Sequence, residues 1–135
     1  MQNKFKFEIT SLDGKHFEDE VDALYFDVPE KGRTGLLANH TSYFAMLFIG
    51  ILYTVKGNDK EYFTYSSGTL RFENNVASVF VDTFEREHEL DRERIESEKK
   101  KAEDILASEQ DSLSYRYQNA VYSLKKATNR LKLLK

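Results

Sequence analysis

The sequence predicts an α+β protein with an N-terminal antiparallel β domain over residues 1–84 and a C-terminal antiparallel helical hairpin over residues 85–135. Two observations support this division. Up to residue 84, short runs of apolar and β-branched residues alternate with turn residues, which is typical of a sandwich or a barrel. From residue 85 to residue 111 the chain has no Gly or Pro, and its apolar residues fit a helix. The absence of Cys excludes a disulfide framework and a thiol nucleophile.

Alternation and turn chemistry predict the strands of the β domain. In the first strand, Phe5, Phe7 and Ile9 fall on one face because side chains alternate with a period of two. Residues 30–35 are expected to form a loop, and Gly50 is expected to mark a bend inside one long strand. The expected strands are 4–10, 16–21, 24–28, 44–55, 61–65, 69–73 and 76–81.

Two helices are expected after the β domain. The first starts at residue 85 and carries few apolar residues, so only a thin stripe is available for packing. Residues 108–112 interrupt the pattern, and a short loop between two helices predicts an antiparallel hairpin. The second helix has an apolar seam at helical spacing, formed by Leu113, Tyr117, Ala120, Val121, Leu124, Ala127, Thr128 and Leu131.

Charge is distributed unevenly along the chain. The net charge is −3, so the chain as a whole does not attract nucleic acid through its field. Residues 85–111 hold 11 acids and 6 bases, whereas residues 112–135 hold 6 bases and no acid. Three interpretations of this basic helix remain open. It pairs with the acidic helix before it, it docks on an acidic protein, or it binds nucleic acid or an anionic membrane.

No catalytic or metal-binding constellation stands out. His16, His40 and His88 are far apart, and none has a second His at metal-ligand spacing. Ser66 lacks the preceding Gly of a nucleophile elbow. The acidic run 18–22 fits a solvated strand edge that discourages aggregation. We therefore expect no metal site and no enzyme acting alone.

Neither a signal peptide nor a membrane span is expected. The charges of the first residues are not followed by an apolar segment. The apolar stretch 43–55 has 13 residues, whereas a spanning helix needs about 20. The sequence thus predicts a protein that is not exported by a standard signal.

Several blocks of the chain, in the same order, resemble the ε subunit of F-type ATP synthases. The family has an Asp-Gly turn, an F-x-G-E-V-D strand, an E-G-x-x-G-I-L-P-G-H loop, a Y-F-x-V-S-G-G-x-L-E-V block and an N-x-V-T-V-L-A-D-T-A-E-R junction. The matching positions are Asp13-Gly14, 17–22, 31–40, 62–72 and 75–86. A two-helix tail follows in both, so the resemblance runs nearly end to end.

The resemblance implies a ten-stranded β-sandwich in a non-catalytic rotor-stalk subunit of a proton- or sodium-translocating synthase. The sandwich is expected to bind the γ subunit and to contact the c-ring through a loop with Arg33 and His40. Here the chain departs from the family, since Ala38-Asn39 replaces Pro-Gly and Arg33 replaces the usual acid. The implied location is the cytoplasmic side of a bacterial membrane, with the plastid stroma as the less favoured alternative. Membrane contact is expected only through the complex, and no nucleic-acid partner is expected.

The resemblance also implies a mobile hairpin. Folded down, it packs on the sandwich; extended, it reaches the α and β subunits of the catalytic head and inhibits ATP hydrolysis. The family's inhibitory second helix is basic, which favours docking on an acidic partner as the interpretation of residues 112–135. The implied inhibitory residues are Arg116, Lys125, Lys126 and Arg130.

An ATP site is implied at the start of the first helix. Some family members bind ATP through I/L-D-x-x-R-A, and residues 90–95 match except that Ile95 replaces Ala. The corresponding ligands are Asp91, Arg94, Lys101, Lys126 and Arg130. If ATP binds there, it is expected to be a regulatory ligand rather than a cofactor, and the chain is expected to act as an ATP-sensing module. The alternative is that Asp91 only caps the helix.

Overall fold

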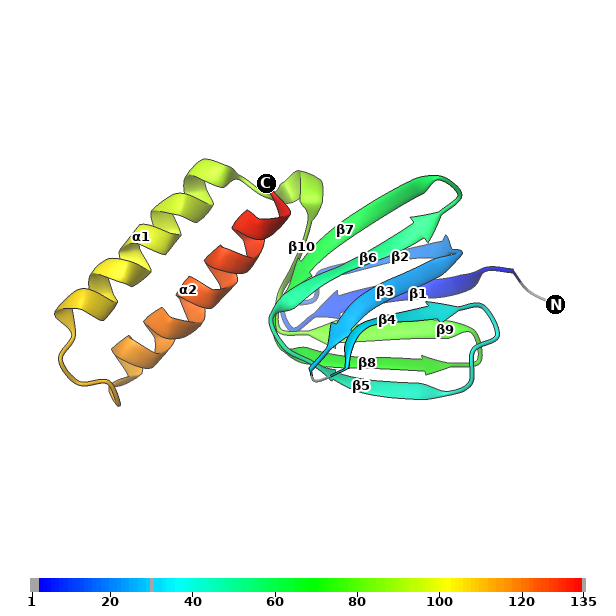
Figure 1. The fold of residues 1–135 in the computed structure, drawn as a ribbon, viewed down its shortest axis with the longest axis horizontal. Helices are drawn as coiled ribbons and strands as arrows, with labels where there is room; N and C mark the ends of the chain where they lie inside the picture. Colours follow the sequence, from blue (N-terminus) through cyan, green and yellow to red (C-terminus); the bar gives the residue numbers. More distant parts are fainter. Residues whose placement is uncertain (1–2, 30, 135) are drawn as a thin grey trace. The chain divides into compact units, whose positions relative to one another are not determined.

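The computed structural model describes residues 3–29 and 31–134 and divides the chain into two compact units, Met1–Glu87 and His88–Lys135 (Figure 1). The first unit contains the strands and the second contains the two α-helices. The division falls three residues beyond the expected position at residue 84.

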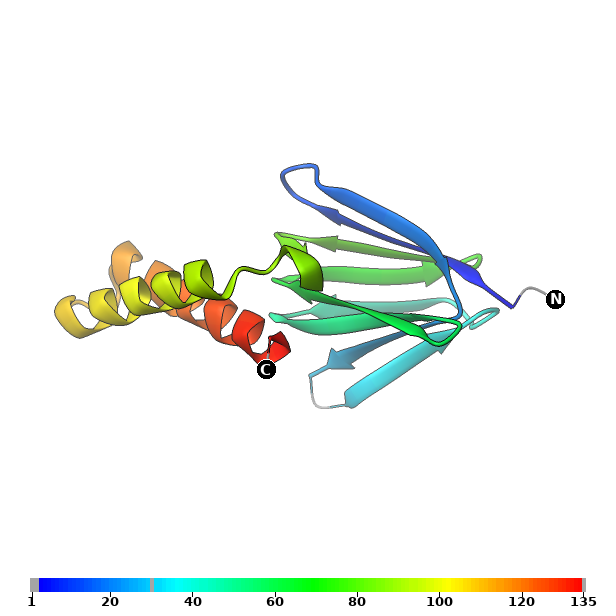
Figure 2. The same cartoon turned by 90° about the horizontal axis from the view of Figure 1, so that it is seen from above.

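The strands of the described residues form two five-stranded sheets, which confirms the predicted sandwich. Sheet I has the strand order β2-β1-β9-β8-β5, and sheet II has the order β10-β7-β6-β3-β4. Neighbouring strands are antiparallel except β1 and β9, which pair in parallel and lie side by side in Figures 1 and 2. The bounds are β1 Phe5–Ser11, β2 His16–Val21, β3 Ala23–Val28, β4 Gly32–Leu37, β5 Tyr43–Leu47, β6 Gly50–Lys56, β7 Asp59–Tyr65, β8 Gly68–Glu73, β9 Val76–Val81 and β10 Phe84–Arg86.

An apolar core rich in aromatic rings lies between the sheets. Phe5, Phe7 and Ile9 are all fully buried, which confirms that they share the inner face of β1. The ring of Phe5 meets that of Phe72 edge-on, with centroids 5.2 Å apart. Each side chain of this size contributes about 1.5–3 kcal/mol when it is fully removed from water. The sandwich therefore has a large apolar core of its own.

Residues 30–35 were expected to form a loop, and this is wrong for residues 32–35. They belong to β4, which pairs antiparallel with β3. The two glycines hide the strand pattern, because Gly32 and Gly35 have no side chain to alternate. Gly35 lies opposite Tyr25, and a Cβ at this position would lie 2.6 Å from Tyr25 Cε1. The glycine thus makes room for the tyrosine ring.

Residues 44–55 were expected to form one strand with a bend, and this is also wrong. They contain β5, which pairs with β8 in sheet I, and β6, which pairs with β7 in sheet II. Residues 48–49 carry the chain from one sheet to the other without a charged or typical turn residue. At Gly50, a Cβ would lie 2.8 Å from Tyr65 Oη, so the glycine marks a close approach of two strands.

The first helix begins later than expected. Strand β10 pairs with β7, so residues 85–86 belong to the sandwich, and Glu87–Glu89 forms the 3-10 turn η1. Helix α1 then spans Arg92–Ser108, and α2 spans Tyr115–Leu133. Arg92 Nη2 donates to the carbonyl oxygen of Leu134 at 2.7 Å, so the start of α1 lies beside the end of α2. The antiparallel hairpin is thereby confirmed.

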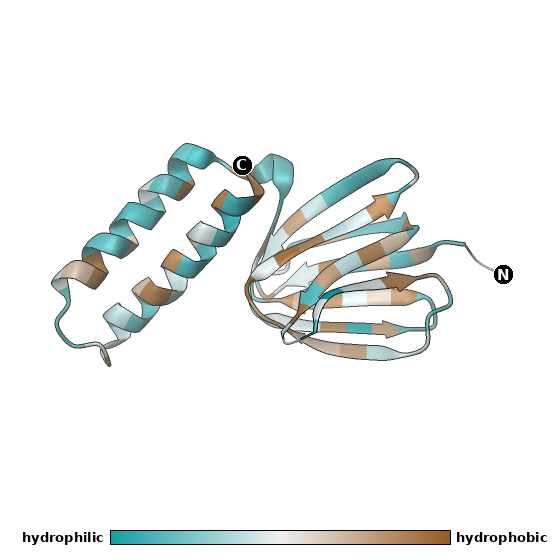
Figure 3. Ribbon diagram, viewed as in Figure 1, coloured by the Kyte–Doolittle hydropathy of each residue, from teal (hydrophilic) through white to brown (hydrophobic). Residues whose placement is uncertain are grey.

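The seam between the helices is narrow. Its fully buried residues are Ile95 and Ala102 on α1, and Ala120 and Ala127 on α2. Leu113 was expected in the seam but lies before the helix and is 87% exposed. Figure 3 shows mostly hydrophilic colour on α1, whereas hydrophobic and hydrophilic colours alternate along α2. None of the described helices is both long enough and apolar enough to cross a membrane.

Candidate interaction sites

Asp91 of the expected ATP site caps α1. Its backbone is extended, and Arg94 N donates to its Oδ1 at 3.3 Å. This satisfies one of the free amide groups at the helix start. The structure thus confirms the capping role that was the alternative to ATP binding.

The side chains of Arg94 and Arg130 meet at one carboxylate. Arg94 Nε lies 3.7 Å from Glu98 Oε1, and Arg130 Nη1 lies 3.4 Å from Glu98 Oε2. The Arg130 side chain is 14% exposed, so this contact between the helices is partly shielded from water. Two of the expected phosphate ligands therefore converge, but on an acid of the chain itself. Glu98 was not predicted, because its role depends on the pairing of the two helices.

The two expected lysine ligands lie elsewhere on the hairpin. Lys101 lines a hollow of about 220 Å³ between the helices, together with residues that include Glu98 and Ser123. The Lys126 ammonium lies over the ring of Tyr122, 5.2 Å from its centroid. The structure therefore brings Arg94 and Arg130 to Glu98, places Lys101 beside the same acid and leaves Lys126 with a tyrosine.

Helix α2 presents the expected inhibitory cations with no acid among them. Arg116 Nη1 lies 3.7 Å from Glu109, which follows α1. Lys125 is exposed and forms no hydrogen bond, ion pair or ring contact within the described part of the chain. The helix thus keeps cationic surface available.

Arg33 and His40 do not share a loop. Arg33 lies at the start of β4, where its Nε is 3.1 Å from Asp27 Oδ1, and His40 follows the end of the same strand. The Nδ1 of His40 lies 2.7 Å from the carbonyl oxygen of Thr41. The expected contact loop is therefore divided between the two ends of β4.

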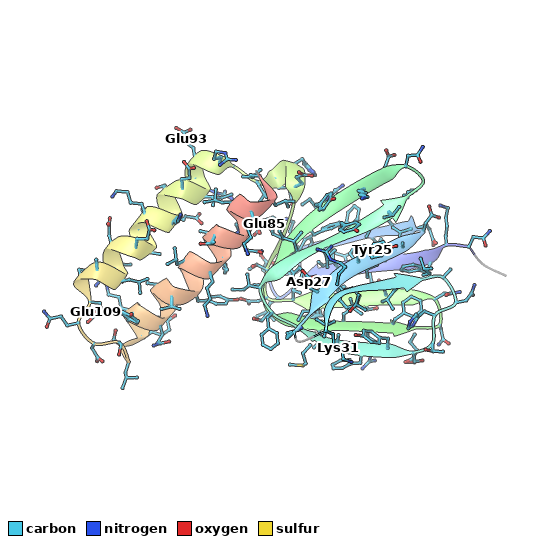
Figure 4. All side chains as sticks on the ribbon, in the orientation of Figure 1. Tyr25, Asp27, Lys31, Glu85, Glu93 and Glu109 are labelled. Carbon is cyan, nitrogen blue, oxygen red and sulfur yellow. The ribbon has the colours of Figure 1, made fainter. Side chains whose placement is uncertain are left out.

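Tyrosines form a ladder on the outer face of sheet II. Tyr25, which Figure 4 labels on β3, stacks on Tyr53 with ring centroids 5.1 Å apart, and Tyr53 lies 5.0 Å from Tyr62. Arg33 and Lys60 lie over the Tyr53 ring at 5.3 and 5.1 Å. Sequence reasoning missed this surface, because the rings are aligned only by the pairing of β6 with β3 and with β7.

A charged network covers β1 and β2 on the outer face of sheet I. Lys6 Nζ lies 3.6 Å from Glu8 and 3.2 Å from Glu18, and His16 Nε2 lies 3.1 Å from Glu18. Hydrogen bonds from His16 and then Lys6 lower the pKa of Glu18, and the bond to Glu18 raises the pKa of Lys6. Glu8, His16 and Glu18 offer ligand atoms within 4.8 Å of one another. The Lys6 ammonium already pairs with both carboxylates.

The other end of the same face is apolar. Phe44 and Met46 on β5 and Phe80 on β9 are 51–58% exposed, and Arg71 on β8 lies among them. The alternation of Phe44 and Met46 with buried Ala45 and Leu47 was the available signal. Sequence reasoning missed it because residues 44–55 were treated as one buried strand.

Comparisons with known proteins agree with this two-part architecture. Residues 4–87 match a family described as the beta-sandwich domain of the ATP synthase Delta/Epsilon chain. An ATP synthase epsilon chain of Clostridium novyi is 32% identical over 136 residues, covering 99% of this chain and 100% of the relative. One from Pediococcus pentosaceus is 28% identical over 128 residues, covering 94% and 92%. The chain therefore belongs to the ATP synthase epsilon chain family, whose members are non-catalytic subunits.

Solved structures of low sequence identity share the fold. A chain in a cryo-EM structure of the Euglena gracilis mitochondrial ATP synthase, OSCP/F1/c-ring, has a TM-score of 0.79 at 18% identity, covering 100% of this chain and 84% of that one. A chain of the Tetrahymena thermophila mitochondrial ATP synthase central stalk and c-ring has a TM-score of 0.63 at 12% identity, covering 99% and 98%. These likenesses extend over both units of the fold.

Proposed function

We propose that this chain is a rotor-stalk subunit of a proton- or sodium-translocating F-type ATP synthase, on the cytoplasmic side of a bacterial membrane. Its sandwich joins the γ subunit to the c-ring, and its helices inhibit ATP hydrolysis by the α and β subunits. Membrane contact occurs only through the complex. Arg33 and His40 are candidate c-ring contacts to be tested singly, because β4 separates them.

The proposed inhibition of ATP hydrolysis is supported mainly by the positive charge of α2. Residues 112–135 hold 6 bases and no acid, and the exposed Lys125 has no partner within the described residues. Such a helix attracts an acidic surface over a Debye length of about 10 Å at 0.1 M salt. The cations therefore recognise an acidic part of the catalytic head when the hairpin extends.

The test replaces Lys125, Lys126 and Arg130 with Ala in the assembled synthase. Hydrolysis of ATP should rise, and the difference from wild type should shrink as salt is added, because salt screens exposed charges. A matched double variant, Lys99→Ala with Lys100→Ala on α1, should hydrolyse ATP as the wild type does. Unchanged hydrolysis in the triple variant, with the subunit still bound, would count against inhibition by α2.

A second candidate function is ATP sensing by the hairpin. It is favoured by the convergence of Arg94 and Arg130 on the Glu98 carboxylate, which a phosphate group would replace. Paired Arg side chains suit phosphate oxygens because the planar guanidinium binds them in pairs. Binding has to displace Glu98, and Ile95 is bulkier than the Ala of the motif, so we expect a Kd of about 1 mM or weaker.

Calorimetric titration of the full chain with ATP tests this candidate. Glu98→Gln should tighten binding, because it removes the competing charge. Glu96→Gln is the matched control, since Glu96 pairs with Arg92 rather than with the two converging arginines. Micromolar affinity of the wild type would overturn the estimate and favour the sensor. If Glu98→Gln and Glu96→Gln bind ATP equally, ATP does not bind at Arg94 and Arg130.

A further inference from the structure

Glu8, His16 and Glu18 bring three possible metal ligands together on the outer face of sheet I. The register pairs Glu8 with Glu18 and Thr10 with His16, and directly opposed residues point to the same side of a sheet. His16 and Glu18 are two residues apart on β2, so they share this side as well. One ligand atom from each of the three residues lies within 4.8 Å of the others. We call these three residues the Glu–His–Glu cluster.

The cluster places two carboxylates directly opposite each other. Like charges at opposed positions of neighbouring strands are destabilising, so Glu8 and Glu18 need a cation between them. Lys6 supplies one positive charge, with its Nζ 3.6 Å from Glu8 and 3.2 Å from Glu18. One ammonium balances only one of the two carboxylates. A divalent cation would balance both.

The imidazole of His16 distinguishes the cluster from a merely acidic strand edge. Its Nε2 lies 3.1 Å from Glu18 Oε1, and its Nδ1 lies 2.8 Å from Thr10 Oγ1. When Nδ1 donates to the threonine, Nε2 keeps its lone pair and faces the carboxylate. Ligating histidines typically hold their second nitrogen in such a hydrogen bond. Glu8 is oriented in a similar way, because Ser78 Oγ donates to its Oε1 at 2.9 Å.

The mixture of one nitrogen and two oxygen ligands indicates the kind of metal. Mg²⁺ and Ca²⁺ prefer oxygen ligands, whereas Zn²⁺ accepts histidine and carboxylate together and is usually four-coordinate. Zinc–ligand bonds of about 2.0–2.2 Å separate the ligand atoms of a tetrahedral site by roughly 3.3–3.6 Å. The 3.1 Å between His16 Nε2 and Glu18 Oε1 is close to this value, and both side chains are exposed enough to adjust.

We propose that the Glu–His–Glu cluster binds one Zn²⁺ ion, with His16 Nε2 and one carboxylate oxygen each of Glu8 and Glu18 as ligands and water in the fourth position. The Lys6 side chain, which is 40% exposed, then turns into solvent. The ion ties β2 to β1 and stabilises the sandwich, because it binds the folded chain. No metal site was expected from the sequence, since the ligands meet only when β1 pairs with β2. Zinc binding does not depend on the proposed rotor function.

The test is a calorimetric titration of the full chain, without a polyhistidine tag, with zinc chloride. The wild type should bind one Zn²⁺ per chain with a Kd below about 100 µM, and Mg²⁺ should bind far more weakly. His16→Ala and Glu18→Gln should abolish this binding. Thr10→Val should weaken it by about tenfold or more, as expected for a residue that orients a ligand. Lys6→Met should tighten it by about fivefold, because it removes a competing cation.

His40→Ala and Asp19→Asn are the matched controls. His40 is an exposed histidine outside the cluster, and Asp19 lies on β2 but pairs with Lys56. Both controls should bind Zn²⁺ like the wild type. In thermal unfolding, Zn²⁺ should raise the midpoint of the wild type and of both controls but not that of His16→Ala. All variants should unfold cooperatively without Zn²⁺.

Three results would overturn the proposed site. Equal Zn²⁺ binding by the wild type and His16→Ala would mean that the ion is adventitious. Binding by Lys6→Met alone would mean that Lys6, rather than a metal, is the cation of the cluster. If neither the wild type nor Lys6→Met binds Zn²⁺ at concentrations up to about 1 mM, the three ligands do not form a site. The rotor function stands in each case.

Discussion

The sandwich and the hairpin bury very different side chains. The sandwich encloses large groups such as Phe7, Phe26, Phe63 and Phe72, whereas the hairpin buries one isoleucine and three alanines. Burial free energy grows with the apolar area removed from water, so most of it lies in the sandwich. The hairpin instead relies on caps and on charge pairs such as Arg130 with Glu98. We therefore expect the sandwich to be the more stable of the two units.

The largest effect is expected in the sandwich core. Phe72→Ala removes a fully buried ring that contacts Phe5, and it should lower the free energy of unfolding by about 3–5 kcal/mol. Urea unfolding followed by far-UV circular dichroism measures the loss. Phe44→Ala, at a ring that is 56% exposed, is the matched control and should change stability little. If Phe72→Ala lowers the free energy of unfolding only slightly, the large rings of the sandwich do not supply most of the burial free energy.

A smaller effect is expected at the start of the hairpin. Asp91→Ala removes the cap and should destabilise α1 by about 1 kcal/mol. Hydrogen exchange resolved by residue should show faster exchange in the first turns of α1, with the sandwich amides unchanged. Asp91→Asn keeps a capping oxygen and should restore protection, whereas Ser97→Ala on the exposed side of the helix should have no effect. If the amides at the start of α1 exchange equally fast in Asp91→Ala and in the wild type, Asp91 does not stabilise the helix as a cap.

The smallest effect concerns pH. A hydrogen bond from Gly57 N and then one from the Lys4 ammonium lower the pKa of Asp22 below its usual 3.8. The folded state therefore favours the charged form, and this stabilisation is present above the usual pKa and lost as the pH falls through the lowered one. Asp22→Asn should destabilise the sandwich near neutral pH and have a smaller effect at an acid pH below 3.8. Urea midpoints at both pH values, with Asp59→Asn as control, measure it. A difference that persists in acid would assign the effect to packing instead.

The sequence predicted those strands and helices whose own residues show a clear periodic pattern. The alternation of Phe5, Phe7 and Ile9 and the narrow seam of α2 were sufficient for the sandwich and the hairpin. Strand β4 was missed because glycines occupy two of its six positions, and the step between β5 and β6 was missed because residues 48–49 contain no turn residue.

The sites depended on contacts between distant segments. Glu98 joins Arg94 and Arg130 only once α1 lies against α2, and no local pattern contains that pairing. The exposed Phe44 and Phe80 lie near Arg71 only because β5 and β9 both pair with β8. The capping role of Asp91 was predictable, because a cap depends on residues within one helical turn.

The most direct test of the account compares the full chain with a chain that ends at Glu87, each assembled into the synthase. The account predicts that both remain bound, since the sandwich has its own core, and that ATP hydrolysis is faster with the shortened chain. The contradicting result is a shortened chain that folds and binds while ATP hydrolysis stays at the rate seen with the full chain. The hairpin would then have no regulatory role.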